Sequence, residues 1–202
     1  MSAPVSPANA SSIVLASQSP RRAEILRQAG IAFSVRPASV DETPRAGERP
    51  LDYVERLAEE KAAAVPAAPD EIVLGADTTV VIDGEMLGKP ADEADARRML
   101  TLLAGRRHEV MTGICLKRGE ERVSDTAVTE VWFGAMTEAE IAEYAASGEP
   151  LDKAGAYAIQ GLASKYVDKI HGCYFNVVGL PVAMVYAHLR YFTKSTELPH
   201  SL

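Results

Sequence analysis

One stretch near the N-terminus constrains the fold of this chain more than any other, because an apolar run passes directly into a helix. Residues 13–17, IVLAS, form a short apolar run that predicts a buried strand. Ser19 suits the N-cap of the following helix, Pro20 suits its first position, and Gly30 stops it. A buried strand followed at once by a helix predicts an α/β fold.

The same helix carries two arginines, Arg21 and Arg22, in its first turn. The amide groups there are unpaired donors and the helix dipole is positive, so each cation costs about 0.3 to 1 kcal/mol when nothing compensates it. A bound anion reverses the sign of that interaction. The pair therefore indicates an anion site, and on this reasoning the removal of Arg22 slightly stabilises the ligand-free protein.

Strands and helices continue to alternate along the chain, without internal repeats. A turn at Asp83 and Gly84 predicts a hairpin, and Thr137 with Glu140 predicts a helical capping box. The pattern predicts strands at 33–37, two within 71–87, and others at 109–117 and 122–133; it predicts helices at 51–65, 96–103, 137–147 and 181–192, with a glycine-rich segment from 147 to 179. We expect a mixed sheet.

Composition limits the class of protein. With 202 residues, 47% of them hydrophobic, the chain can bury one core or one domain with two lobes. We expect a loose N-terminal tail at 1–12, one domain over 13–192 and a C-terminal tail at 193–202. The formal charge of −7 opposes a surface that coats nucleic acid or a membrane.

The sequence also indicates a compartment. No basic region precedes Arg21, and no apolar run approaches the roughly 20 residues that span a bilayer. The two cysteines, Cys115 and Cys173, lack CxxC spacing and are expected to be reduced. We therefore expect a cytoplasmic protein.

Asp77 directly follows the buried run at residues 72–76 and precedes two threonines. In α/β folds the ligand crevice lies at strand ends, so we expect Asp77 to stand at a strand end beside such a crevice. A carboxylate there can hold a hard metal ion or position a water. A structural carboxylate satisfied by local amides fits the same pattern.

Lysine, histidine, serine and tyrosine side chains are further candidates for functional residues. Lys61 interrupts an alanine-rich helical face, and Lys89 is held between a glycine and a proline, which makes it the stronger phosphate candidate. The four histidines lack zinc-binding spacing, and no serine lies in a nucleophile elbow. Tyr144, Tyr157 and Tyr166 are expected in the core rather than stacked on a base.

Eight segments resemble the Maf family in sequence and in order along the chain. They are ASQSPRRAEIL (16–26), SVDE (39–42), EEKA (59–62), LGADTTV (74–80), LGKP (87–90), HEVMTG (108–113), SGEPLDKAGAYAIQGLA (147–163) and NVVGLP (176–181). SPRR alone would be a weak signal, whereas SPRR, ADT, GKP and GEPxDKAGAY together are specific. The resemblance covers nearly the whole chain.

The resemblance implies a nucleoside triphosphate pyrophosphatase, a metal-dependent hydrolase that cleaves between the α and β phosphates. The products are a nucleoside monophosphate and pyrophosphate. The implied fold is α/β, with an elongated, twisted mixed sheet flanked by helices and two lobes around a deep cleft, similar to inosine triphosphatase. Residues 13–192 would form this single catalytic domain, and a homodimer is a common assembly in the family.

The resemblance also implies roles for individual residues. Asp77 matches the family's proposed general base; because an ordinary aspartate is a weak base, a shared site for Mg²⁺ or Mn²⁺ with Glu42 is an equally good account. The sequence leaves these two roles open. The implied phosphate-binding residues are Ser17, Ser19, Arg22, Lys61 and Lys89.

Three residues match positions linked to base specificity in the branch that acts on dTTP and UTP: Arg21, Thr78 and Gln160. A glutamine amide offers both a donor and an acceptor to the edge of a pyrimidine. The related branch that prefers 7-methyl-GTP carries an acidic residue near Gln160. Ala158 and Ala163 stand where the branch often has glycine, a small departure. Modified pyrimidine nucleotides stay open as substrates.

Two other classes of function stay open on the sequence. The first is a nucleotide-binding regulator of cell division, since Maf relatives are associated with division arrest; metal-dependent release of pyrophosphate from dTTP distinguishes it from an enzyme. The second is a nucleic-acid-binding module, which the net acidity and the lack of an aromatic and basic array oppose. We expect a nucleoside triphosphate as partner, and neither a nucleic-acid polymer nor a membrane.

Overall fold

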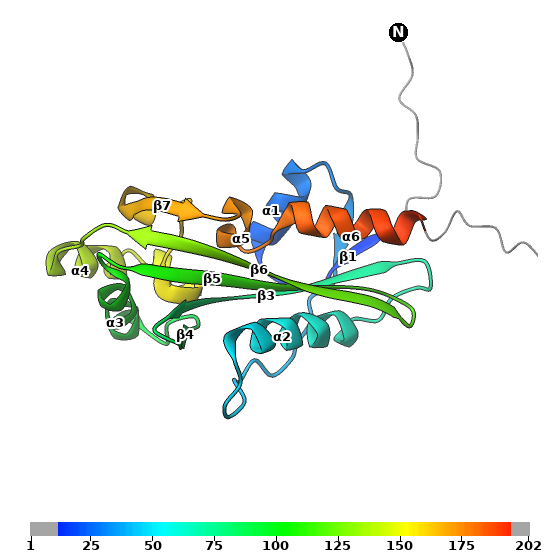
Figure 1. Ribbon diagram of the computed structural model, residues 1–202, viewed down its shortest axis with the longest axis horizontal. Coiled ribbons are helices and arrows are strands. Elements are labelled where there is room, and N and C mark those ends of the chain that lie inside the picture. Colours follow the sequence, from blue (N-terminus) through cyan, green and yellow to red (C-terminus); the bar gives the residue numbers. More distant parts are fainter. Residues whose placement is uncertain (1–11, 195–202) are drawn as a thin grey trace, which may run out of the picture.

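Three long strands run along the molecule and organise the fold (Figure 1). They are β3 (Ile72–Ile82), β5 (Arg107–Arg118) and β6 (Glu121–Phe133), and each pairs antiparallel with the next. The computed structural model describes residues 12–194. The predicted tails, 1–12 and 193–202, therefore lie almost wholly outside the described residues.

Four shorter strands widen the sheet at its two ends. β1 (Ile13–Leu15) pairs parallel with β3 and with β2 (Phe33–Val35). At the other end, β4 (Glu85–Leu87) returns along β3 through the predicted Asp-Gly hairpin turn, and β7 (Val167–His171) pairs antiparallel with β6. The order β2-β1-β3-β5-β6-β7, with β4 also on β3, confirms the expected mixed sheet.

β1 and β4 share one edge of β3 and leave a gap between them. β1 pairs with residues 72–74 and β4 with residues 80–82, whereas β5 occupies the other edge along 73–81. Asp77 lies in this gap, in the middle of the eleven-residue strand β3, so its expected place at a strand end is wrong. The crevice forms because β1 ends there, not because β3 does.

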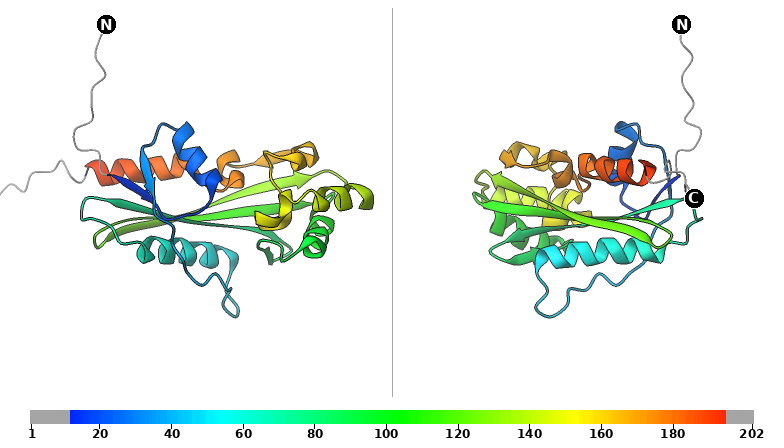
Figure 2. Two further views of the ribbon diagram at one scale, coloured as in Figure 1. Left: turned by 180° about the vertical axis from the view of Figure 1, so that it is seen from behind. Right: turned by 45° about the vertical axis from the view of Figure 1, so that its right-hand side comes forward.

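Helices cover both faces of the sheet (Figures 1 and 2). α2 (Pro50–Ala64) packs on one face, against β3 and β5. α1 (Pro20–Gln28), α5 (Tyr174–Val178) and α6 (Val182–Lys194) lie on the other. The side chains that join α1 and α6 to this face are buried: Leu15, Ile25, Leu26, Leu74, Ile114, Val185 and Phe192. These elements form the first lobe.

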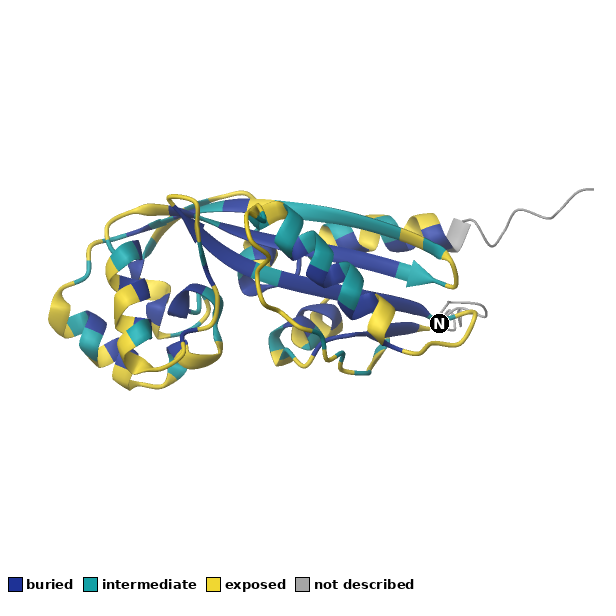
Figure 3. Cartoon of the chain, turned by 90° about the horizontal axis from the view of Figure 1, so that it is seen from below, coloured by how far each residue is buried: buried dark blue, intermediate teal, exposed yellow. Residues whose placement is uncertain are grey.

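The second lobe surrounds the far ends of the long strands. It contains α3 (Glu93–Leu103) and α4 (Glu138–Ala146). The predicted capping box is present at the N-terminus of α4. Its core includes Val80, Ile82, Leu100, Leu103, Val131, Phe133 and Tyr144, and the two other tyrosines predicted as core, Tyr157 and Tyr166, are also buried. Figure 3 shows the two lobes on one continuous, mostly buried sheet. The elongated two-lobed α/β fold is therefore as expected.

The glycine-rich segment 147–179 holds elements that the sequence pattern did not predict. Besides β7 and α5, it forms three 3₁₀ turns, η1 (Glu149–Asp152), η2 (Ala154–Ala156) and η3 (Leu162–Tyr166). Each element has five residues or fewer, which is too short for a hydrophobic period to emerge. Their positions depend on packing against β6 and the second lobe.

Two further expectations concern local chemistry. Ser19 is the N-cap of α1, but its side chain makes no capping hydrogen bond; instead its amide donates to Ser17 Oγ over 3.2 Å. Cys115 and Cys173 are both free thiols, as predicted. No helix among residues 12–194 is long and apolar enough to cross a membrane.

Two glycines let α2 approach the sheet closely around Asp77. A Cβ atom on Gly75 would lie 2.1 Å from the carbonyl oxygen of Ala58, and one on Gly113 would lie 2.2 Å from that of Val54. Gly75 shares the α2-facing side of β3 with Asp77, and Gly113 is the cross-strand partner of Asp77. The glycines therefore set the height of α2 above Asp77.

We predict that Gly75→Ala lowers the free energy of unfolding by about 3 kcal/mol, because the new methyl group meets helix backbone that cannot move aside locally. Gly88→Ala is the matched control, since a Cβ there meets no atom within 4 Å. Urea unfolding of both variants measures the difference. Equal stability of the two variants would show that α2 is not held by this contact.

Candidate active site

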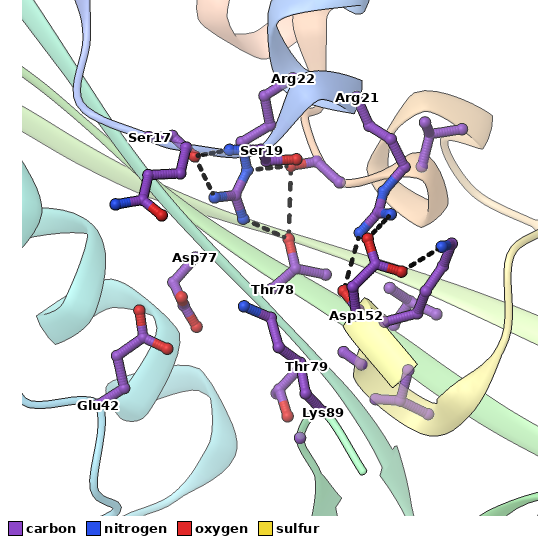
Figure 4. Close-up of a pocket in the computed structure, with 18 of the residues that line it drawn as sticks. Ser17, Ser19, Arg21, Arg22, Glu42, Asp77, Thr78, Thr79, Lys89 and Asp152 are labelled. Atoms are coloured by element: carbon purple, nitrogen blue, oxygen red, sulfur yellow. Dashed lines mark hydrogen bonds and ion pairs between the residues drawn. The ribbon is translucent and has the colours of Figure 1, made fainter. Parts of the chain in front are cut away.

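A cleft of about 500 Å³ lies at the open edge of β3, between the two lobes. Every residue that the sequence singled out for the site lines it: Ser17, Ser19, Arg21, Arg22, Glu42, Lys61, Asp77, Thr78, Lys89 and Gln160. Figure 4 labels all of these except Lys61 and Gln160. The residues of the full set come from the β1–α1 connection, the first turn of α1, the loop before α2, α2 itself, β3, the loop after β4 and the segment between η2 and η3. The fold thus gathers one site from segments far apart in sequence.

Lys61 joins two carboxylates at the floor of the cleft. Its Nζ atom lies 2.6 Å from Asp77 Oδ1 and 2.6 Å from Glu42 Oε1. Lys61 and Asp77 are 8% and 7% exposed, whereas the Glu42 side chain is about half exposed. A buried ammonium needs such partners, because an unpaired buried charge is strongly unfavourable.

The pKa values of Asp77 and Glu42 shift in opposite directions. Burial raises the pKa of Asp77 above its ordinary value, and the positive charges of Lys61 and Arg22 oppose this without cancelling it. Partial burial also raises the pKa of Glu42, but the hydrogen bond from Lys61 and the charges of Lys61, Lys89 and Arg22 together bring it below its ordinary value. Asp77 is therefore the better proton acceptor of the pair.

Arg22 is fixed by the protein itself. Its Nε donates to the carbonyl oxygen of Gly179 over 2.8 Å, and its two terminal nitrogens donate to Ser17 Oγ and Thr78 Oγ1, each over 3.0 Å. Burial lowers the pKa of the guanidinium, and the charge of Asp77 opposes that shift. These bonds dock α1, so the structure favours the opposite of the sequence expectation, namely that removal of Arg22 destabilises the free protein.

Arg21, its neighbour, is held much more loosely. One terminal nitrogen donates to Asp152 Oδ2 over 3.2 Å, with the arginine side chain 30% and the aspartate 63% exposed. An exposed ion pair of this kind contributes about 0 to 1 kcal/mol, so a ligand can displace Asp152 at little cost. The pair connects α1 of the first lobe to η1 of the second across the cleft.

The remaining predicted residues differ in how free they are. Ser17 Oγ accepts from Arg22 and from the Ser19 amide, and Thr78 Oγ1 lies 2.9 Å from Thr112 Oγ1, so both hydroxyls already have protein partners. Lys89 extends into the cleft toward Asp77 and Thr78 (Figure 4). Gln160 is exposed on the wall of the cleft.

The oxygen donors suit a hard divalent cation. Asp77 and Glu42 lie close together, each with one oxygen 2.6 Å from Lys61 Nζ, and Mg²⁺ is typically held by one or two carboxylates together with waters and substrate phosphates. Among residues 12–194 no group of three or more acidic, histidine or cysteine side chains forms a closed metal cage. The donor set therefore fits an ion shared with a phosphate ligand better than a structural metal.

A family model described as Maf-like protein matches residues 12–192. The chain belongs to the Maf family. The predicted resemblance is thus confirmed over nearly all of the described residues.

Several Maf relatives are similar over most of their length. A protein of Anaeromyxobacter dehalogenans strain 2CP-C is 56% identical over 182 residues, covering 88% of this chain and 92% of its own. One from Koribacter versatilis is 52% identical over 179 residues, covering 88% and 93%. Both are named dTTP/UTP pyrophosphatase. Among solved structures, the Ham1 protein of Staphylococcus aureus aligns with a TM-score of 0.45 and 19% identity, over 60% of this chain and 71% of that one.

Among the cleft residues that were not singled out from the sequence, three make polar contacts within the site. Asp152 and Lys153 belong to the Maf segment GEPLDKAGAY, where Lys153 Nζ bonds Asp152 and the carbonyl oxygen of Glu149. Tyr53 donates its hydroxyl to the carbonyl oxygen of Glu42 over 3.0 Å and so anchors the loop that carries this carboxylate. Only the motif itself signalled the first two, and nothing in the local pattern signalled Tyr53.

We predict that Arg22→Ala destabilises the ligand-free protein by about 2 to 3 kcal/mol, because two buried acceptors and one part-buried acceptor lose a charged donor at once. Thermal and urea unfolding without ligand measure this change. Arg27→Ala is the matched control, since Arg27 lies at the exposed end of the same helix. A variant at Arg22 as stable as the parent would contradict the docking role.

Proposed function

We propose that this chain is a nucleoside triphosphate pyrophosphatase that hydrolyses dTTP and UTP to the monophosphate and pyrophosphate. The observation that carries the proposal is the convergence, in one cleft, of a buried carboxylate with four cationic side chains, Arg21, Arg22, Lys61 and Lys89. The names of relatives at 52–56% identity support the choice of substrate.

The charge of the site matches a polyphosphate. Phosphoryl and nucleotidyl transfer depend mainly on positioning and on neutralising the phosphate oxygens. Arg21 and Lys89 are the cations best able to reorient onto a ligand, since Arg21 has only an exposed partner and Lys89 extends into the open cleft. In this proposal Arg22, held by protein acceptors, contributes positive potential and fixes α1, and Lys61 and Lys89 stabilise the leaving pyrophosphate.

Asp77 has the central chemical role in the proposal. A divalent cation, Mg²⁺ or Mn²⁺, would be held by Asp77 and Glu42, and when bound it would lower the pKa of a water and neutralise phosphate charge. In this proposal Asp77 orients the attacking water and accepts its proton. Lys61 keeps the carboxylate aimed into the cleft through its 2.6 Å contact.

We predict that Asp77→Asn retains the fold and loses turnover by about 100-fold or more, because the amide has nearly the same shape but neither accepts the proton nor binds a cation well. Pyrophosphate release from dTTP, measured with and without Mg²⁺ or Mn²⁺, is the readout. Asp125→Asn, a change to a carboxylate on β6 outside the cleft, is the control. Near-normal turnover by folded Asp77→Asn contradicts the assignment.

In this proposal the base is recognised at the wall of the cleft that carries Gln160. Gln160 can donate and accept hydrogen bonds to the carbonyl and imide edge of thymine or uracil. Arg21 and Thr78 line the same cleft and complete the base-specificity set proposed here.

We predict that Gln160→Glu changes selectivity more than chemistry. The carboxylate loses the donor to a base carbonyl, which costs about 1 to 3 kcal/mol, or about 5- to 150-fold in kcat/KM for dTTP and UTP. The measurement compares kcat/KM for dTTP, UTP, CTP and 7-methyl-GTP in the parent and variant. An unchanged ranking and spacing would show that Gln160 does not read the base, and a parent preference for 7-methyl-GTP would refute the proposed substrate.

A further inference from the structure

Gln160 lies on the wall of the cleft and is the exposed residue of the short segment 157–161 between η2 and η3. A side chain that selects a base must be held in a fixed orientation, since misplacement by about 1 Å can cost 100-fold. The backbone on both sides of Gln160 is tied to groups in η1 and α4, behind the cleft wall. These ties are a candidate device for orienting the base reader.

The carboxylate of Glu149, the first residue of η1, binds the segment after Gln160. The Leu162 amide donates to both oxygens of Glu149, over 3.0 and 3.1 Å. A Cβ atom on Gly161 would lie 2.3 Å from each of those oxygens, so the backbone rests directly on the carboxylate. Only glycine permits that approach.

The segment before Gln160 is tied to the same carboxylate through Tyr144 of α4. The Tyr144 hydroxyl donates to Glu149 Oε1 over 2.7 Å and accepts from the Ala158 amide over 3.2 Å. Burial raises the pKa of Tyr144, and its hydrogen bond to Glu149 raises it further, so the phenol stays a donor. One carboxylate thus holds both flanks of Gln160.

We propose that Glu149 is a positioning residue for base recognition: through the Leu162 amide, and through Tyr144 to the Ala158 amide, it fixes the orientation of Gln160. This inference rests on the proposed function. The same turn ends at Asp152, the partner of Arg21 in the ligand-free protein, so η1 contacts two of the three side chains assigned to base specificity, directly or through the backbone that carries them. η1 is therefore the element that relates the base-reading groups on the two sides of the cleft.

The first test compares a nucleotide with its base-free analogue. Glu149→Ala is expected to lower kcat/KM for dTTP about 10-fold and to leave kcat/KM for 2-deoxyribose 5-triphosphate within about 2-fold, because only dTTP has a base to position. Glu149→Gln, which keeps an acceptor for Leu162, is expected to recover most of the loss. Glu143→Ala on the exposed side of α4 is the control and should change neither value.

Equal losses for the two substrates would show a general structural role, and no loss for dTTP would show no role; either result overturns the inference. If the parent protein itself does not release pyrophosphate from dTTP, the proposed function fails instead.

A second test does not depend on turnover. Amide hydrogen exchange in the ligand-free protein is expected to accelerate at Leu162 and Ala158 by about 10-fold in Glu149→Ala, because this variant removes the acceptor of the Leu162 amide and the group that holds the Tyr144 hydroxyl. It is expected to accelerate at Ala158 alone in Tyr144→Phe, which removes the acceptor of the Ala158 amide. Unchanged exchange at both amides in Glu149→Ala refutes the positioning role whatever the activity. Unfolding curves of both variants show that the exchange is local.

Discussion

The buried ammonium of Lys61 is the interaction on which the site depends. It sits between Asp77 and Glu42, and it reaches them only because α2 lies almost on the backbone of β3 and β5. That approach requires two glycines. Gly75 lies two residues before Asp77 on the same face of β3, and Gly113 is the cross-strand partner of Asp77. Core packing and active-site geometry are therefore the same constraint, because a side chain at either glycine would move the helix and the cation together.

The two adjacent arginines illustrate how one sequence signal divides into two physical roles. Arg22 is buried with three protein acceptors and docks α1 against β3 and the residue after α5. Arg21 has an exposed partner on the other lobe and can exchange it for a ligand. The prediction of a bound anion therefore rests on Arg21, because Arg22 obtains its compensation from a carbonyl and two hydroxyls.

The local sequence pattern was sufficient to predict the long helices and strands and insufficient to predict the short elements between them. The helical periodicity predicted α2, and the apolar runs on both sides of Asp83 predicted the β3–β4 hairpin, because each pattern extends over several residues. The place of Asp77 was mispredicted because the crevice is set by where β1 ends, which is a property of pairing. β7, α5 and the contacts of Glu149 were missed because they depend on tertiary packing. The motif segments of the Maf family, rather than periodicity, assembled the set of cleft residues.

The central claim is that this cleft cleaves a pyrimidine nucleoside triphosphate between its α and β phosphates. Phosphorus-31 NMR of dTTP incubated with the full chain and Mg²⁺ or Mn²⁺ tests it most directly, because it identifies every phosphorus-containing product. We expect dTMP and pyrophosphate in equal amounts. Formation of dTDP and orthophosphate, or tight binding of dTTP without turnover, would contradict it.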